Sequence, residues 1–458
     1  MSILIRPIVI LFLFAFSLSG FAAGEKPLQQ AQDRPNIILM MADDLGFETV
    51  SANGGAPYKT PILDRLAAEG IRFTNCVAQP LCTPSRVKLM TGRYNFRNYR
   101  EFGILDPRET TFGNVMRDSG YATCITGKWQ LGKDRKLIKP FGFDEYCLWW
   151  LEGKSNRYNN VGELIQNGEV RPGNQGEFGP DVVSAFMLDF ITRHKDEPFF
   201  CYYPMILTHS PFELTPDSPP EHTKDSSALE LMAGMVAYAD KIVGRVVDHL
   251  DELGIRENTI LLFIGDNGTN QSVTGGSVGE HDWPGGKGSN FVEMGMRVPL
   301  VVNYPGGRSG GAVFDDPVDL TDFLPTFAEL AGIGLPKDLP LDGHSFAGRL
   351  VGDSNYKPHS WAYVGYYSKN RGDMSHFARD KQFKLYEGGY LYDFVKDPGH
   401  ARPINIETTG PKGKAAYKRL KKVLEGMKKQ FAAGDAYAGK PTKLLSTKPG
   451  LQNLKPKK

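Results

Sequence analysis

The chain has 458 residues, of which 41% are hydrophobic, 23% charged and 11% aromatic, which is typical of a folded globular protein. This composition excludes intrinsic disorder, a collagen-like repeat and a multi-span membrane protein. The net charge is +2, but six lysines fall within residues 439–458, and residues 25–438 hold 47 basic and 52 acidic side chains, a net charge of −5, which gives no reason to expect a nucleic-acid partner.

Residues 1–24 have the pattern of a secretory signal peptide. Arg6 gives a positive start, residues 7–18 are apolar, and small residues at 20–24 offer a cleavage site. This apolar stretch of 12 residues is too short to span a bilayer, because a spanning helix needs about 20. We therefore expect an exported protein, periplasmic or extracellular, with no stable membrane span.

Apolar strands and amphipathic helices then alternate along the chain. Residues 35–41 form a continuous apolar run typical of a strand buried on both faces. Residues 60–70 predict a helix with Thr60 as its N-cap and Pro61 in the first turn. Further helices are expected at 112–118, 181–194 and 229–253, and further strands at 121–125, 199–203, 259–264 and 298–302. This alternation predicts an α/β fold with a large, mostly parallel sheet covered by helices on both faces.

The pattern changes after Gly343. Residues 360–366 and 383–392 are aromatic and alternating, and residues 414–433 predict a helix with one apolar side. We therefore expect a smaller C-terminal antiparallel sheet with one helix packed on it. The expected organisation is a signal peptide at 1–24, a large α/β domain at 25–343, a smaller α+β subdomain at 344–438 and a basic, disordered tail at 439–458.

Oxygen-rich pairs of residues follow two of the expected strands. Asp43 and Asp44 end the first strand, and Asp266 and Asn267 follow the strand at 259–264. Ligands bind beyond the carboxyl ends of strands in such sheets, and three carboxylates gathered there repel one another unless a cation lies between them. Oxygen ligands favour Ca²⁺ over zinc or copper. The alternative is that each pair caps a helix or turns a loop.

The most specific motif comprises residues 82–86, Cys-Thr-Pro-Ser-Arg, with Thr-Gly-Arg following at 91–93. Here the chain resembles the sulfatase family, whose signature is Cys-x-Pro-x-Arg followed by a Thr-Gly-Arg segment. The resemblance extends from about Pro35 to Pro398 and implies an alkaline phosphatase-like fold with its catalytic domain at 25–343. It also implies that a maturation enzyme oxidises Cys82 to formylglycine, an aldehyde that is hydrated in the resting site. The alternative is an inert, buried thiol.

A hydrated aldehyde suits sulfate esters for a chemical reason. A serine nucleophile would end as a sulfated side chain with no easy exit. In a geminal diol, one hydroxyl attacks sulfur and expels the alcohol, and the other then collapses to the aldehyde and expels sulfate. The resemblance implies that Ca²⁺, bound by Asp43, Asp44, Asp266, Asn267 and residue 82, lowers the pKa of the attacking hydroxyl.

The resemblance also implies roles for four residues in matching motifs. Arg86 steadies the hydrated aldehyde, and Lys128, in Gly-Lys-Trp, contacts sulfate. His209, in Thr-His-Ser-Pro, faces the leaving-group oxygen, and Lys287 lies on that same side. The alternatives are solvated surface lysines and a loop histidine with ordinary hydrogen bonds.

Gln130 departs from the family pattern, which has histidine at this position and uses it to help deprotonate the diol. Glutamine forms hydrogen bonds but accepts no proton at neutral pH. Either another base serves, or sulfate release is slower, or the diol is positioned differently. We still expect activity, because the nucleophile, metal and cation positions are intact.

Two loops outside these motifs favour a carbohydrate substrate. Residues 94–100 and 280–283 contain arginine, histidine and tryptophan, which bind sulfate or uronate groups and stack on sugar rings, although ordinary loop packing explains them equally well. We expect a sulfated polysaccharide or oligosaccharide. The rival interpretations are a phosphodiester or phosphonate hydrolase of the same superfamily, and a non-catalytic protein that binds sulfated glycans. A thiol enzyme that uses Cys82 unmodified lacks a matching histidine pattern.

Overall fold

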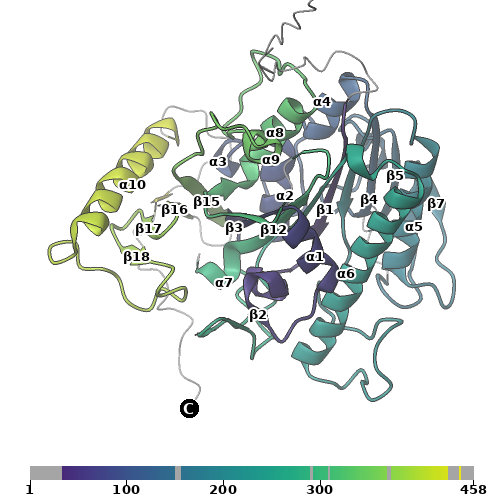
Figure 1. The fold of residues 1–458 in the computed structure, drawn as a ribbon, viewed down its shortest axis with the longest axis horizontal. Helices are drawn as coiled ribbons and strands as arrows, with labels where there is room; N and C mark the ends of the chain where they lie inside the picture. Colours follow the sequence, from purple (N-terminus) through teal and green to yellow (C-terminus); the bar gives the residue numbers. More distant parts are fainter. Residues whose placement is uncertain are drawn as a thin grey trace, which may run out of the picture.

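The larger unit is built on one central sheet (Figure 1). The structure is a computed structural model that describes residues 34–149, 156–288, 292–307, 310–368, 373–431 and 443–444. The strands of the central sheet are β1 (Asn36–Ala42), β3 (Ile71–Val77), β4 (Ala122–Lys128), β5 (Glu145–Trp149), β6 (Leu164–Gln166), β7 (Glu169–Arg171), β8 (Phe199–Pro204), β9 (Thr259–Gly265), β12 (Arg297–Asn303), β13 (Ala312–Phe314) and β14 (Val318–Asp319). Their order is β13-β3-β12-β9-β1-β8-β4-β5-β6-β7, and β14 pairs with β3.

The centre of this sheet is parallel and its flanks are mixed. Strands β9, β1, β8, β4 and β5 pair in parallel, as the alternation of strands and helices predicted. Strand β12, predicted at 298–302, runs antiparallel to both β9 and β3. At the other side, β6 is antiparallel to β5 and to β7. The predicted large sheet is therefore confirmed, with antiparallel strands added on both sides of a parallel centre.

Helices cover both faces of the sheet, as predicted. Neighbouring residues of β1 supply both cores: Leu39 packs in one hydrophobic cluster and Met40 in the other, which explains why this strand is apolar throughout. One face carries α1 (Pro61–Glu69), α5 (Gly179–Arg193) and α6 (Ala228–Glu252), and the other carries α2 (Cys82–Thr91), α4 (Phe112–Asp118), α8 (Phe323–Leu330) and α9 (Ala347–Val351). The remaining elements of this unit are α3 (Asn95–Asn98), α7 (Glu293–Met296) and a small sheet of β2 (Gly55–Ala56), β10 (Ser277–Val278) and β11 (His281–Asp282).

Helix α1 begins at Pro61 with Thr60 at the N-cap position, as predicted, but Thr60 makes no side-chain capping hydrogen bond. Its hydroxyl instead donates to Asp64 and contacts the Ser51 hydroxyl at 2.8 Å. The Thr60 hydroxyl also accepts a hydrogen bond from the backbone N–H of Ser51, so these contacts tie the helix start to the preceding loop.

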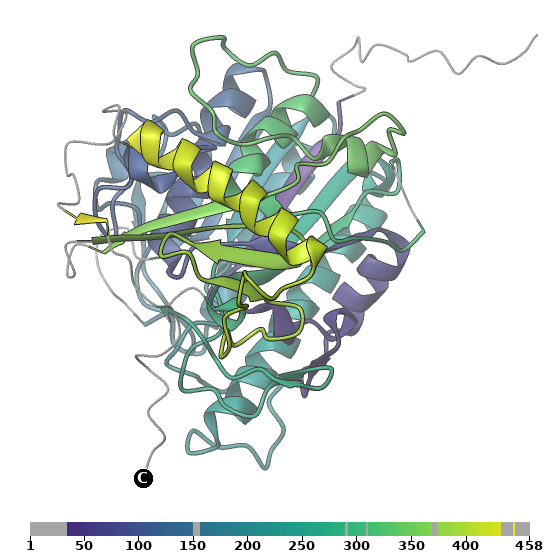
Figure 2. The same cartoon turned by 90° about the vertical axis from the view of Figure 1, so that its left-hand side faces the viewer.

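The smaller C-terminal unit confirms the predicted antiparallel sheet and helix. Strands β15 (Ala362–Ser368), β16 (Asp373–Arg379), β17 (Phe383–Tyr386) and β18 (Leu391–Asp393) pair antiparallel in that order. Helix α10 (Pro411–Gln430) lies across this sheet, as Figure 2 shows, and contacts β16 and β17. It buries the predicted apolar side, which comprises Ala416, Leu420, Leu424 and Met427.

Two predictions concern the boundary between the units at residue 343 and the tail at 439–458. Phe346 and Leu350 pack in a core cluster of the larger unit. We therefore propose that the boundary between the units lies after Val351, later than residue 343. Most of the tail predicted to be disordered lies outside the described residues, but Lys443–Leu444 forms a short strand, β19, parallel to β16.

A buried cluster of charges joins the two units. Glu293 in α7 accepts a hydrogen bond from Arg379 Nη1 at 3.0 Å, and Lys384 Nζ lies 2.5 Å from its other oxygen. Burial alone would raise the pKa of Glu293, but these two cations lower it to about 2. All three side chains are fully buried, and the carboxylate is ionised at neutral pH. The cluster thus fixes the small sheet against the segment that follows Lys287.

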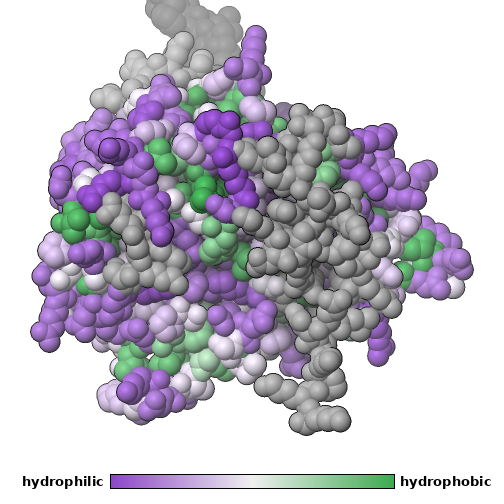
Figure 3. Space-filling model, turned by 180° about the vertical axis from the view of Figure 1, so that it is seen from behind, coloured by the Kyte–Doolittle hydropathy of each residue, from purple (hydrophilic) through white to green (hydrophobic). Residues whose placement is uncertain are grey.

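The face of the molecule seen in Figure 3 is largely hydrophilic among the atoms coloured by hydropathy. Apolar residues among these atoms gather only in small, separate patches. Within the described ranges, every helix is too short or too polar to cross a membrane. The predicted signal peptide at 1–24 lies outside the described residues.

Candidate active site

The four predicted metal ligands meet at the carboxyl ends of two neighbouring strands. Asp43 and Asp44 follow β1, and Asp266 and Asn267 follow β9. The backbone N–H of Asp44 donates to Asp266 Oδ1, and Asn267 Nδ2 donates to Asp44 Oδ1, both at 2.9 Å. All four residues are fully buried. The two oxygen-rich pairs therefore form one cluster, as the parallel register predicts.

Cys82 lies against this cluster. It is the first residue of α2 and only 1% exposed. Its Sγ and carboxylate oxygens of Asp43 and Asp266 lie within 4.8 Å of one another. The thiol donates a hydrogen bond of 3.0 Å to Gln130 Oε1, and burial raises its pKa. Residue 82 thus touches both the acidic strand ends and the position where the family motif has histidine.

Three cations surround the same carboxylates. Arg86 Nη2 donates to Asp266 at 2.9 Å and lies 3.7 Å from Asp43. Lys128 Nζ donates to Asp43 at 2.6 Å, and Lys287 Nζ lies 2.6 Å from Asp44 Oδ1. Neither lysine is a solvated surface side chain, because Lys128 is buried and Lys287 is mostly buried. The structure therefore brings all the predicted cations to one site.

The position of Lys128 depends on the glycine before it. Gly127 has φ +114°, a conformation that side chains with a Cβ rarely adopt. A Cβ at this residue would lie 2.1 Å from the carbonyl oxygen of Pro204 in β8. The end of β4 thus approaches β8 closely enough to point Lys128 at Asp43 only because residue 127 is glycine.

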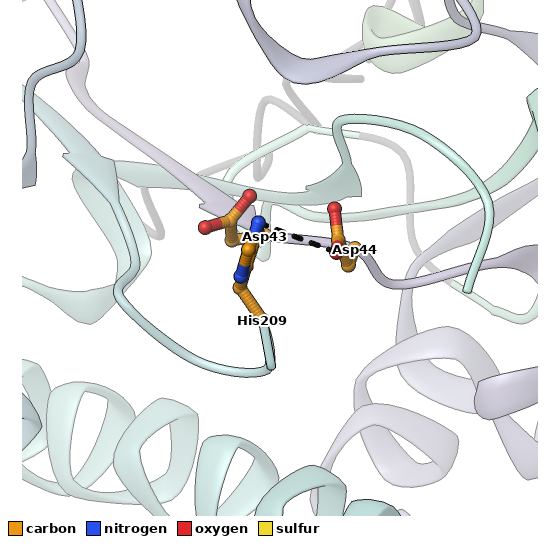
Figure 4. A group of neighbouring side chains, drawn as sticks. All are labelled: Asp43, Asp44 and His209. Atoms are coloured by element: carbon orange, nitrogen blue, oxygen red, sulfur yellow. Dashed lines mark ion pairs between the residues drawn. The ribbon is translucent and has the colours of Figure 1, made fainter. Parts of the chain in front are cut away.

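His209 completes the group from the loop after β8 (Figure 4). Its Nε2 lies 3.7 Å from Asp44 Oδ2. Its Nδ1 contacts the carbonyl oxygen of Ser210, so Nδ1 carries the hydrogen and Nε2 has the lone pair. Burial lowers the pKa of His209 to about 4, with the charges of Lys128 and Lys287 acting in the same direction. The imidazole is therefore neutral at pH 7.

The charges of this cluster fit a bound divalent cation. Burial alone would raise the pKa of Asp43, but the charges of Lys128, Arg86 and Lys287 lower it well below its usual range. The pKa of Asp44 is raised by burial and by Asp43, and burial raises that of Asp266 to about 6. Asp43 Oδ1 and Asn267 Oδ1 are buried and accept no hydrogen bond within the part of the chain that the structure describes. Open oxygens of this kind suit Ca²⁺ or another hard ion.

Sequence reasoning missed two residues that support the site. Thr269 accepts a hydrogen bond from the Gly46 backbone at 3.1 Å, and its carbonyl accepts one from the Lys287 backbone at 2.9 Å. Its hydroxyl donates to Glu48, whose pKa burial raises to about 7. Thr269 thus links the segment after β1 to the segment of Lys287. Its place directly after the Gly-Asp-Asn-Gly motif was the only signal in the sequence.

The loops predicted to contact substrate are partly occupied by packing. Trp283, expected to stack on a sugar, is 2% exposed and packs beside Phe47 with a ring-centroid distance of 6.1 Å. Arg97 Nε donates to Asp342 at 2.8 Å, and Arg100 pairs with Asp106. For Trp283 the expectation of sugar stacking is wrong, and the alternative of loop packing holds.

Known proteins give the site a family context. Residues 35–333 match the family model described as Sulfatase, and residues 279–430 match the model described as N-sulphoglucosamine sulphohydrolase, C-terminal. The chain is 28% identical to steryl-sulfatase of Mus musculus, over 84% of this chain and 81% of that protein. It is 27% identical to arylsulfatase D of Homo sapiens, over 82% of this chain and 83% of that protein.

Solved structures agree with this result. The structure of Ps i-CgsB superposes with a TM-score of 0.75 and 27% sequence identity, over 89% of this chain and 94% of that one. The phosphonate monoester hydrolase of Agrobacterium radiobacter has a TM-score of 0.63 and 21% identity, over 88% of this chain and 96% of that one. The second likeness shows a shared fold.

Proposed function

Because the chain belongs to the sulfatase family and is a sulfuric ester hydrolase, we propose that it releases sulfate from a sulfated polysaccharide or oligosaccharide. We propose further that Cys82 matures to formylglycine and that Asp43, Asp44, Asp266, Asn267 and residue 82 bind Ca²⁺. One observation carries this proposal: Sγ of residue 82 and the carboxylates of Asp43 and Asp266 lie within 4.8 Å of one another.

Three cationic residues have separate roles in this proposal. The hydrated aldehyde would supply the nucleophilic hydroxyl. The bound metal would place its positive charge beside a sulfate oxygen. Lys128 and Lys287 offer ammonium groups beside the acidic cluster to neutralise the sulfate oxygens. Arg86 holds the carboxylates of Asp266 and Asp43 in place through its ion pairs.

His209 serves the leaving group in this proposal. Its Nε2 is unprotonated in the structure and faces the acidic cluster. A sulfate anion bound beside it favours the protonated imidazole, because an opposite charge stabilises the cation. The protonated ring can then pass its proton to the alcohol oxygen as the S–O bond breaks.

The choice of a carbohydrate rests on one structural relative. Ps i-CgsB, 27% identical to this chain with a TM-score of 0.74, has been solved in complex with k-i-k-neocarrahexaose, an oligosaccharide. The test is a panel of sulfated glycans, an aryl sulfate and matched phosphate esters, with release of free sulfate or phosphate measured. We expect sulfate release from at least one glycan. Activity confined to aryl esters would contradict the carbohydrate proposal.

The same panel decides between the rivals. Faster turnover of a phosphate ester than of its matched sulfate ester would favour the phosphodiester or phosphonate hydrolase. Binding of glycans without sulfate release, after mass spectrometry has verified formylglycine at position 82, would favour the non-catalytic binding protein.

Gln130→Ala is expected to lower kcat for sulfate release by about five- to tenfold, the value of one hydrogen bond. Gln130 Oε1 accepts a hydrogen bond from the residue 82 side chain, and we propose that it orients the mature side chain in the same way. Stopped-time assays of sulfate release would measure the change, with thermal unfolding to compare stability. Unchanged kcat would mean that Gln130 does not position residue 82.

Location and maturation complete the proposal. We propose that residues 1–24 direct export to the periplasm or the extracellular space, and that a formylglycine-generating maturation enzyme acts on Cys82. Residues 439–458 hold six lysines without an acidic side chain, and most of this segment lies outside the described residues.

A further inference from the structure

Arg157 is a buried cation that the proposed mechanism does not use. Its guanidinium carbon lies 4.4 Å from the centre of the Trp149 ring, at the end of β5. The residue is 8% exposed. Its Nη1 has no hydrogen-bond partner among the described residues. A buried guanidinium with an open N–H is unusual, because an unsatisfied charged donor is costly to bury.

This guanidinium lies beside the active site. Trp149, under it, is the register partner of Lys128 on the neighbouring strand β4. The next residue, Tyr158, donates its hydroxyl to the carbonyl oxygens of Ile206 and His209. The positive charge of Arg157 also contributes to the lowered pKa of His209, for which burial is the largest cause. Arg157 therefore lies between the end of β4 and the loop that carries His209.

The position of Arg157 determines which part of the substrate its guanidinium can contact. Lys128 and Lys287 are bound to the carboxylates around residue 82, where the sulfate ester is proposed to react. His209 faces the leaving-group side, from which the rest of the substrate extends. Arg157 directly precedes Tyr158, whose hydroxyl holds the His209 carbonyl, and we place the guanidinium of Arg157 on this leaving-group side, beside the sugar. The planar guanidinium suits a carboxylate or sulfate oxygen pair better than a neutral hydroxyl.

We propose that Arg157, held by stacking on Trp149, binds a second anionic group of the substrate, on the sulfated sugar or on its neighbour. The group is a carboxylate or a second sulfate ester, which share the same oxygen chemistry. Arg157 is thus a specificity-determining residue for doubly anionic carbohydrates. This inference rests on the proposed carbohydrate function.

The test compares Arg157→Gln with the unchanged protein on substrates that share the reacting sulfate. One has no second charge, one has a neighbouring uronate, and one has a second sulfate; a small aryl sulfate is the fourth. Expected is a rise in KM of roughly 10- to 100-fold on the preferred doubly anionic substrate, the value of a hydrogen bond to a charged group. The KM on the singly charged substrates should stay within about twofold, and any change in kcat that arises through the pKa of His209 should be the same on all four substrates. The uronate and disulfate arms identify the second group.

Two further variants separate binding from structure. Arg157→Lys keeps the charge without the fork and should recover part of the affinity. Arg193→Gln removes an arginine that also lies over an aromatic ring, 5.9 Å from that of Phe190, but pairs with Glu145 at the opposite end of β5. It should leave all constants unchanged. Thermal unfolding of each variant shows how much stability is lost.

A second readout keeps this inference distinct from the proposed function. Competitive inhibition of aryl sulfate hydrolysis by the same sugars measures their binding even where none is hydrolysed. If the unchanged protein cleaves no glycan, the carbohydrate function fails, but preferential inhibition by doubly anionic sugars that disappears in Arg157→Gln still supports the role of Arg157. Equal changes on singly and doubly anionic sugars, or no change on either, would overturn it.

Discussion

Cys82→Ser is expected to lose sulfate release by on the order of 10³-fold or more while keeping its fold. Serine offers only one hydroxyl, so a sulfated side chain would have no second hydroxyl through which to release sulfate. The exchange of sulfur for oxygen in one small, buried side chain changes little packing. Free sulfate release, thermal unfolding and the peptide mass around residue 82 measure the three parts of this result.

Cys124→Ser is the matched control for this variant. Cys124 is also a buried, free thiol, and it lies in β4, four residues before Lys128. Its loss should leave turnover within about twofold, since its side chain packs in a hydrophobic cluster of the core and not among the acidic strand ends. Clear residual turnover in Cys82→Ser, or full activity of a protein whose Cys82 is still a thiol by mass spectrometry, would contradict the aldehyde mechanism.

Removal of divalent ions is expected to abolish activity, and Ca²⁺ is expected to restore it. Asn267→Ala tests the proposed site without removing a charge: it takes away the amide oxygen, which accepts no hydrogen bond among the described residues, together with the Nδ2 donor to Asp44. Half-maximal activity should then need at least about tenfold more Ca²⁺. Ca²⁺ should also raise the melting temperature of the unchanged protein, since it binds only the folded state.

Asn36→Ala is the control at the other end of the same strands. Asn36 Nδ2 donates to Thr259 Oγ1 at 3.3 Å, at the start of β1 and β9. This variant should lose some stability but keep the Ca²⁺ requirement. Activity that survives thorough chelation, or that only a transition metal restores, would contradict a calcium site.

Much of the site was predictable from the sequence, because the order of the strands and their parallel pairing determine which residues lie together at the carboxyl ends. Asp43 and Asp266 end apolar runs, and parallel strands bring their carboxyl ends together. Cys82 was identified by its motif, and its contact with the acidic residues followed from no single pattern. The position of Gln130 against the thiol is likewise a tertiary contact.

Other features depend on contacts that no local pattern encodes. Strand β3, Ile71–Val77, was missed because it follows α1 after a single glycine and because the consecutive polar residues Thr74 and Asn75 break the apolar–polar alternation that marks a strand. The sequence left sugar stacking and loop packing as equal alternatives for Trp283, and its packing beside Phe47 decides for loop packing. No pattern in the sequence pointed to Arg157. Its proposed role depends on stacking against Trp149 and on the loop of His209, and both contacts exist only in the folded chain.

The near-complete burial of the Cys82 thiol determines the order in which maturation and folding can occur. Under the proposed maturation of Cys82, its oxidation has to precede closure of the domain, because a macromolecular catalyst reaches a side chain only while the surrounding polypeptide is open. Molecules that fold before this oxidation keep an unmodified thiol at position 82. The active fraction of a preparation is accordingly set during synthesis and export, and adding the catalyst to the purified protein would leave that fraction as it was.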